Sequence, residues 1–145
     1  MVAKTDKKDA VIGVVLVTHG TFGETLLKAA ETVMGPQENC LAVGVDVNKG
    51  VDETLESVRN AIHSLEQGKG VLALTDLFGG SPTTMSLSLM KSENLEVITG
   101  VNLPMVVAAI QARSMKLPEL AEKVMTAGQQ GIKVAGAMLR KKAKK

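Results

Sequence analysis

Two short polar segments of this chain hold the residue types that could do chemistry. His19 lies between an apolar run and a glycine, in the sequence Val-Leu-Val-Thr-His-Gly of residues 15–20. Asp76 follows another apolar run and opens the sequence Asp-Leu-Phe-Gly-Gly-Ser-Pro of residues 76–82. An imidazole changes its charge near neutral pH and can act as a nucleophile. A carboxylate that accepts a proton from one ring nitrogen would leave the other nitrogen free to react.

Apolar runs and helical periodicities alternate along the chain and indicate the elements that position these residues. We expect strands at residues 11–18, 41–47, 71–75 and 95–99. The first helix is expected at residues 21–34, and the second between its N-cap Asp52 and Gly68. Three more helices are expected, one that begins at the cap Ser81, one from Pro104 to residue 115 and one from Pro118 to residue 127. Such alternation predicts an α/β fold, a three-layer, doubly wound and mainly parallel sheet with a strand order near 2-1-3-4. The stretch 131–136 stays open between a short edge strand and a helix end.

This strand order predicts that the two polar segments face each other. They follow the first and third strands, which lie side by side at the switch point where such sheets bind ligands. Gly79 and Gly80 permit a tight turn and a close approach, and the helix that starts at Ser81 offers unpaired N–H groups to an anion. An aspartate, an imidazole and an anion cradle together suit a phosphoryl group carried on His19. The segment 102–105 could line the same edge or merely end a strand.

The composition argues against several other functions. Two phenylalanines are the only aromatic residues, so a nucleic-acid stacking surface is not expected. Cys40 is the only cysteine, which excludes an internal disulfide, fits a reducing cytoplasm and leaves Cys40 as a small apolar residue. One histidine and one aspartate are too few for a usual metal site, and no cofactor is required. The apolar run 11–17 is too short to span a bilayer, and no signal peptide is recognised.

Basic residues gather at the two ends of the 145-residue chain, although its net charge is only +2. We expect one domain at residues 11–136 between a flexible tail at 1–10 and a basic tail at 137–145. The basic residues of the two tails are Lys4, Lys7, Lys8, Arg140, Lys141, Lys142, Lys144 and Lys145.

The second histidine, His63, falls beside the apolar stripe of its helix and is expected on a solvated face.

Three segments, residues 18–20, 76–82 and 100–105, resemble in order and spacing the mannose-family IIA domain of the bacterial sugar phosphotransferase system. The resemblance covers roughly residues 11–134. It implies a carrier in which His19 takes a phosphoryl group on its tele nitrogen, while Asp76 orients the ring. It also implies that Ser81, Gly80, Gly79 and Thr18 bind the phosphoryl oxygens. Phe78 stands where a tryptophan is common in the family.

The same resemblance implies the partners. The phosphocarrier protein HPr would donate the phosphoryl group, a IIB component on a separate chain would accept it, and membrane IIC and IID components could associate. A homodimer is also implied, in which the stretch 131–136 forms an antiparallel edge strand exchanged between subunits. Such an unpaired edge needs a partner strand.

Two other functions remain to be weighed. Ser81, His19 and Asp76 formally make a serine-hydrolase triad, but Ser81 opens a helix beside Pro82 and lies outside a G-x-S-x-G elbow. A regulatory binding module, whose partners depend on phosphorylation, would need the same His19 chemistry as a transport component. The residues alone do not separate transport from regulation.

Overall fold

Within residues 9–143, which the computed structural model describes, strands and helices alternate from the first strand to the fourth. The elements are β1 Gly13–His19, α1 Phe22–Met34, β2 Cys40–Val45, α2 Val51–Leu65, β3 Val71–Thr75, α3 Ser81–Ser88, β4 Leu95–Ile98, α4 Leu103–Gln111, α5 Leu117–Gln130 and α6 Ala135–Ala143. Each connection between neighbouring strands carries a helix, as parallel pairing requires. No helix in this part of the chain has both the length and the apolarity needed to cross a membrane.

All strand pairs of the sheet are parallel, and the strand order is β2-β1-β3-β4. The predicted α/β fold and its order 2-1-3-4 are therefore confirmed. Val14 pairs with Cys40 on one side and with Leu72 on the other, so β1 is central. Residues 14–17 of β1 are completely buried, which explains why this strand reads as an unbroken run of β-branched and aliphatic residues.

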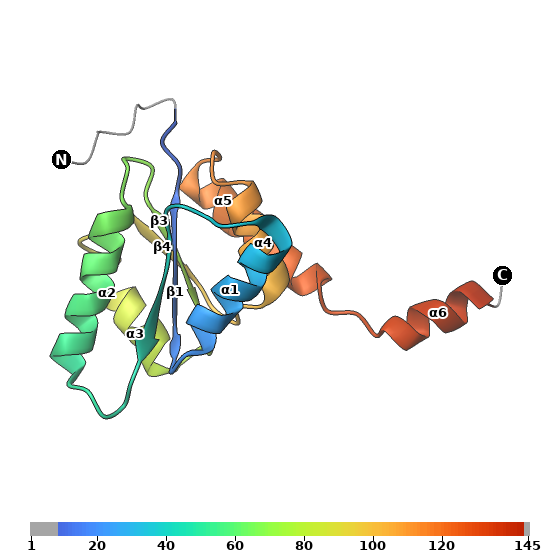
Figure 1. Ribbon diagram of the computed structural model, residues 1–145, viewed down its shortest axis with the longest axis horizontal. Helices are drawn as coiled ribbons and strands as arrows, with labels where there is room; N and C mark the ends of the chain where they lie inside the picture. The colour runs from blue at the N-terminus through green and yellow to red at the C-terminus, as the bar shows by residue number, and fades with distance from the viewer. Residues whose placement is uncertain (1–8, 144–145) are drawn as a thin grey trace.

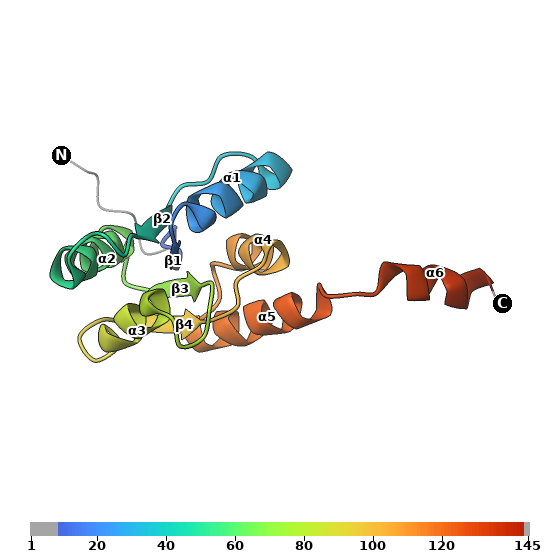
Figure 2. The same cartoon turned by 90° about the horizontal axis from the view of Figure 1, so that it is seen from below.

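Helices cover both faces of the sheet, with α1, α4 and α5 on one face and α2 and α3 on the other (Figures 1 and 2). Alternate residues of β1 divide between the two cores, because successive side chains of a strand point to opposite faces. Val14 and Leu16 pack with α4 and α5, whereas Val15 and Val17 pack with α2. The sheet is thus held rigidly from both sides, and its strand ends are fixed positions for a site.

The expected C-terminal edge strand at residues 131–136 is wrong for this chain. The helix α5 continues to Gln130, a short irregular stretch follows, and α6 begins at Ala135. The cartoon shows α6 standing apart from the sheet (Figures 1 and 2). Alanine, methionine, leucine, arginine and lysine dominate α6 and have high helix propensity. An edge strand also needs a hydrogen-bonding neighbour, and residues 131–136 pair with no strand in the described part of the chain.

The helix starts differ from the sequence-based expectations by one or two residues. Gly50, not Asp52, is the N-cap of α2, and Asp52 lies in the first turn, where its charge still complements the helix dipole. Gly80 is the N-cap of α3, so Ser81 is the first helical residue and makes no side-chain cap. The division into residues 1–10, 11–136 and 137–145 stays a prediction, and residues 1–8 and 144–145 lie outside the described part.

Candidate functional site

His19 and Asp76 meet at the carboxyl end of the sheet. His19 is the last residue of β1, and Asp76 directly follows β3, its neighbour. The backbone N–H of His19 donates to Asp76 Oδ2 at 3.0 Å, and Nδ1 of the ring lies 2.9 Å from the same oxygen. An ionised carboxylate can only accept hydrogen bonds, so Nδ1 carries the proton. The other ring nitrogen, Nε2, is then the unprotonated nucleophile in the neutral ring.

The environment of Asp76 favours its ionised form. The side chain is only 15% exposed, and burial by itself would raise the pKa of this carboxyl. The backbone and ring hydrogen bonds from His19, together with the charge of the ring, outweigh burial and lower the pKa of Asp76 below its usual value of 3.8. Asp76 therefore accepts from Nδ1 at neutral pH and stabilises positive charge that develops on the ring.

The turn between β3 and α3 lies directly against the imidazole. Gly79 has a φ of +84°, which side chains disfavour and which turns the loop back toward β1. A Cβ added to Gly80 would lie 2.9 Å from His19 Cε1 and 3.5 Å from Nε2. Gly80 is also the N-cap of α3, so the unpaired N–H groups and the positive dipole end of this helix lie on the Nε2 side of the ring.

Ser81 and Thr18 occupy different positions around this centre. Ser81 is exposed at the first position of α3. Thr18 is completely buried, and its hydroxyl accepts from the N–H of Gly23 at 2.7 Å and lies 3.4 Å from the carbonyl oxygen of His19. The Thr18 hydroxyl thus supports the junction of β1 and α1 behind His19. Its position argues for a supporting role rather than direct contact with a phosphoryl oxygen.

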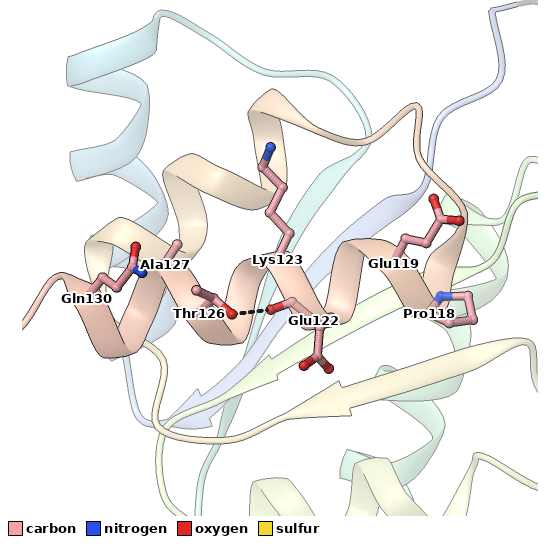
Figure 3. Close-up of a pocket in the computed structure, with 7 residues that line it drawn as sticks. All are labelled: Pro118, Glu119, Glu122, Lys123, Thr126, Ala127 and Gln130. Atoms are coloured by element: carbon pink, nitrogen blue, oxygen red, sulfur yellow. Dashed lines mark hydrogen bonds between the residues drawn. The ribbon is translucent and has the colours of Figure 1, made fainter.

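His19 is accessible from solvent, since its side chain is 44% exposed. It borders a hollow of about 440 Å³ between the ends of β1 and β2, which Gly20, Thr21, Asp46 and Val47 also line. Another hollow of about 730 Å³ lies along α5 (Figure 3) and is lined by that helix alone. Figure 3 shows its side chains spread along the helix without converging on one point. Of these two hollows, the one beside His19 gives solvent access to a ring whose Nδ1 is bonded to Asp76.

The other residues considered from the sequence stand apart from this centre. His63 is exposed, with Nε2 2.6 Å from Glu93 Oε1. Burial raises the pKa of the Cys40 thiol, only partly opposed by the charge of Arg113, so Cys40 is a poor nucleophile. Within residues 9–143 no three His, Cys, Asp or Glu side chains gather to hold a metal ion. Asn102 caps α4 by accepting from the N–H of Met105 at 3.1 Å, which favours a structural role for the segment 102–105.

Sequence reasoning missed one buried polar pair beside the site. The hydroxyls of Thr75 and Thr83 lie 2.7 Å apart at the end of β3 and the start of α3. Threonine is ordinary both in strands and in first helical turns. No signal in the sequence distinguishes this pair from unrelated threonines, because only the fold brings the two hydroxyls together.

These features define a doubly wound α/β domain with a histidine–carboxylate pair at its switch point. Residues 13–125 match the EIIA-man family, described as the PTS system fructose IIA component. The chain belongs to this family and is a IIA phosphotransferase component of the sugar phosphotransferase system (PTS), as the resemblance of its motifs predicts.

Individual relatives support the same assignment. The PTS system mannose-specific EIIAB component of Escherichia coli (strain K12) is 36% identical over 129 residues, and the match covers 87% of this chain but only 40% of that protein. The PTS system fructose-specific EIIA component of Bacillus subtilis (strain 168) is 26% identical over 133 residues, covering 90% of this chain and 91% of the relative. The crystal structure of EIIA from Streptococcus agalactiae aligns with a TM-score of 0.79 at 27% identity, covering 87% and 98% of the two chains.

The lowered pKa of Asp76 predicts an acid-dependent contribution to stability. Because the folded-state pKa lies below the unfolded-state value, ionised Asp76 stabilises the fold above the unfolded-state pKa, and this contribution disappears as the pH falls through the folded-state pKa. Asp76→Asn is expected to lower the free energy of unfolding at about pH 7. The difference from wild type should shrink progressively below about pH 4. Urea denaturation across this range measures the difference. Asp9→Asn controls for replacing an exposed aspartate outside any helix, and a difference independent of pH would contradict the expectation.

The contact of Gly80 with the imidazole predicts a local effect of one methyl group. Gly80→Ala leaves the backbone in an allowed conformation, since φ is −78° and ψ is 166°, but its Cβ forces the His19 ring or the turn to shift. NMR spectra of the histidine rings should show displaced His19 resonances and unchanged His63 resonances. Gly50→Ala is the matched control, because Gly50 is the N-cap of α2 and its Cβ would meet nothing within 4 Å. Unshifted His19 resonances in Gly80→Ala would refute this packing.

Proposed function

We propose that His19 is the phosphoryl acceptor of this IIA component and carries the group on Nε2 between two protein partners. The supporting observation is the 2.9 Å contact of Nδ1 with Asp76, which commits one nitrogen to the carboxylate and leaves the other as the nucleophile. The donor is the phosphohistidine of HPr, and the acceptor is a IIB component. Both transfers take place on the cytoplasmic side of the membrane components.

The transfer is an in-line exchange between two imidazoles. The lone pair of Nε2 attacks phosphorus, the nitrogen–phosphorus bond of the donor breaks, and the donor ring leaves with the bonding electron pair. The Nδ1 proton stays on His19, where Asp76 stabilises the cationic ring. Developing charge on the phosphoryl oxygens is met by the N–H groups at the start of α3 and by the Ser81 hydroxyl. Gly79 and Gly80 let this cradle approach the ring closely.

The surroundings of His19 favour a protein as the donor. Apolar side chains are exposed on four segments at the carboxyl end of the sheet. They are Phe22 on α1, Val47 after β2, Val51 on α2 and Leu77 after β3. An exposed apolar surface with a reactive centre fits a docking partner that buries it, rather than a hydrated sugar. The named relatives are mannose-specific and fructose-specific. The proposed site binds only the phosphoryl group, so other components determine which sugar is transported.

The alternatives gain less support. No hydrogen bond among residues 9–143 joins Ser81 to His19, as a serine nucleophile and its base would require. A regulatory module would use the same His19 chemistry, and no observation on the described residues favours it over transport.

Replacing the acceptor is the direct test. Labelled phosphoenolpyruvate, enzyme I and HPr should label the wild-type chain with phosphate that is labile in acid and stable in base, and His19→Ala should abolish the label. His63→Ala is the matched control and should be labelled normally. Retention of label on His19→Ala would show that another residue carries the phosphoryl group.

We extend the proposal to a homodimer formed through the β4 edge of the sheet. Among residues 9–143 the strand β4 pairs only with β3, and a hollow of about 480 Å³ runs beside it. Apolar residues contribute much of the lining, including Phe78, Leu87, Val97, Ile98 and Met125. An unpaired strand flanked by exposed apolar side chains is a surface that a second copy of the chain can cover.

Sedimentation velocity tests the dimer. Wild type at a concentration on the order of 50 μM should sediment as a dimer, as expected for an interface with micromolar or tighter affinity. Leu87→Lys places a charge in the β4 hollow at a side chain that is already exposed, and it should shift the protein toward monomer. Val33→Lys changes an exposed side chain of α1, which contributes no residue to this hollow, and it should leave the dimer intact. A monomeric wild type would refute the dimer without affecting the proposed role of His19.

A further inference from the structure

Two buried hydroxyls link the strand that precedes Asp76 to the helix that faces His19. Thr75, the last residue of β3, is completely buried, and Thr83, the third residue of α3, is 2% exposed. Their Oγ1 atoms lie 2.7 Å apart, and Thr83 Oγ1 lies 2.7 Å from the carbonyl oxygen of Leu77. These contacts span the turn that carries Gly80.

The direction of this hydrogen-bond chain follows from the groups involved. A threonine hydroxyl has one proton, and the Leu77 carbonyl can only accept. Thr83 therefore donates to Leu77, and Thr75 donates to Thr83. The same carbonyl oxygen also accepts from the N–H of Gly80 at 3.1 Å. The position of Gly80 is thus fixed through the carbonyl of Leu77, which the two threonines hold.

Packing alone does not require hydroxyls at these two positions. Valine has nearly the shape of threonine and avoids the cost of burying a polar group. What the hydroxyls add is a directional hold on the turn. Because Gly80 packs against the Cε1 and Nε2 side of the His19 ring, this hold fixes the start of α3 relative to the nucleophile.

We infer that Thr83, assisted by Thr75, is a positioning residue for phosphoryl transfer. It holds the Leu77 carbonyl so that the N–H groups at the start of α3 stay aligned with a phosphoryl group on His19 Nε2. This inference rests on the proposed role of His19. The Thr83 hydroxyl is bonded to Thr75 and to Leu77, so its effect on the rate is exerted through the turn.

Variants of the two threonines separate this role from ordinary stability. Thr83→Val breaks the chain at its centre and leaves the Thr75 hydroxyl buried without its acceptor, so both stability and the transfer rate should fall. The loss of rate is expected to be on the order of tenfold, as for a modest displacement of a catalytic group. Thr83→Ser keeps the hydroxyl and should restore the rate. Thr75→Val should have a smaller effect, because Thr83 can still donate to Leu77.

The double variant Thr75→Val/Thr83→Val is the decisive comparison. It removes both hydroxyls, so neither is left buried without a partner, and stability should recover toward wild type. The carbonyl of Leu77 keeps the N–H of Gly80 but still lacks the Thr83 hydroxyl that held it, so the single-turnover rate from phosphorylated HPr should stay about tenfold low, with the KM for HPr unchanged. Ser86→Ala removes another buried α3 hydroxyl, which donates to Pro82 at 2.7 Å, and should transfer at the wild-type rate.

The outcomes separate the positioning role of Thr83 from the carrier role of His19. Wild-type transfer in Thr83→Val, or a rate that recovers together with stability in the double variant, would overturn the positioning role and leave His19 as the carrier. Label retained on His19→Ala would instead overturn the proposed function itself, whatever the threonine variants do.

Discussion

The hydrogen bonds between His19 and Asp76 are the constraint on which the rest of the structure depends. One carboxylate oxygen accepts from both the backbone N–H and the ring Nδ1 of the same residue. This arrangement fixes the ring orientation, the tautomer and the end of β1 together. It requires β1 and β3 to be direct neighbours with matched ends, which the parallel pairing of Val17 with Thr75 provides. The crossover helices α1 and α2 therefore serve the site by producing the order 2-1-3-4.

The turn after Asp76 must meet two opposed demands. It has to leave the carboxylate pointing back toward β1, and within four residues it has to bring the start of α3 forward against the ring. Gly79 makes the reversal possible through its positive φ, and Gly80 makes the close approach possible by lacking a side chain. Such a glycine-rich turn would be conformationally loose by itself. The buried hydroxyls of Thr75 and Thr83 supply the restraint that the glycines lack.

The parts of the structure that follow from local pattern could be predicted from the sequence. Buried parallel strands read as continuous apolar runs, so the sheet order and the meeting of His19 with Asp76 followed from topology. The exact helix caps did not, because Gly80 and Ser81 are both acceptable N-caps and tertiary packing chose between them. The contact of Thr83 with Leu77 depends on how the turn closes, which no spacing encodes. The C-terminal prediction was wrong because helix propensity in residues 135–143 outweighs strand pairing in a chain considered alone.

Exposure differs sharply between the two residues of the pair, and the difference has a physical reason. Asp76 must be shielded, because a carboxylate surrounded by water would interact weakly with the cationic ring. Under the proposed function His19 must be open, because a protein-borne phosphohistidine has to reach Nε2 along the line of attack. The observed side-chain exposures, 15% for Asp76 and 44% for His19, satisfy both requirements at once. A buried histidine would retain the pairing and lose access, whereas an exposed aspartate would retain access and lose the electrostatic stabilisation of the ring. The end of a central strand, covered by helices on both sides and open along its axis, is the position in this fold that meets both demands.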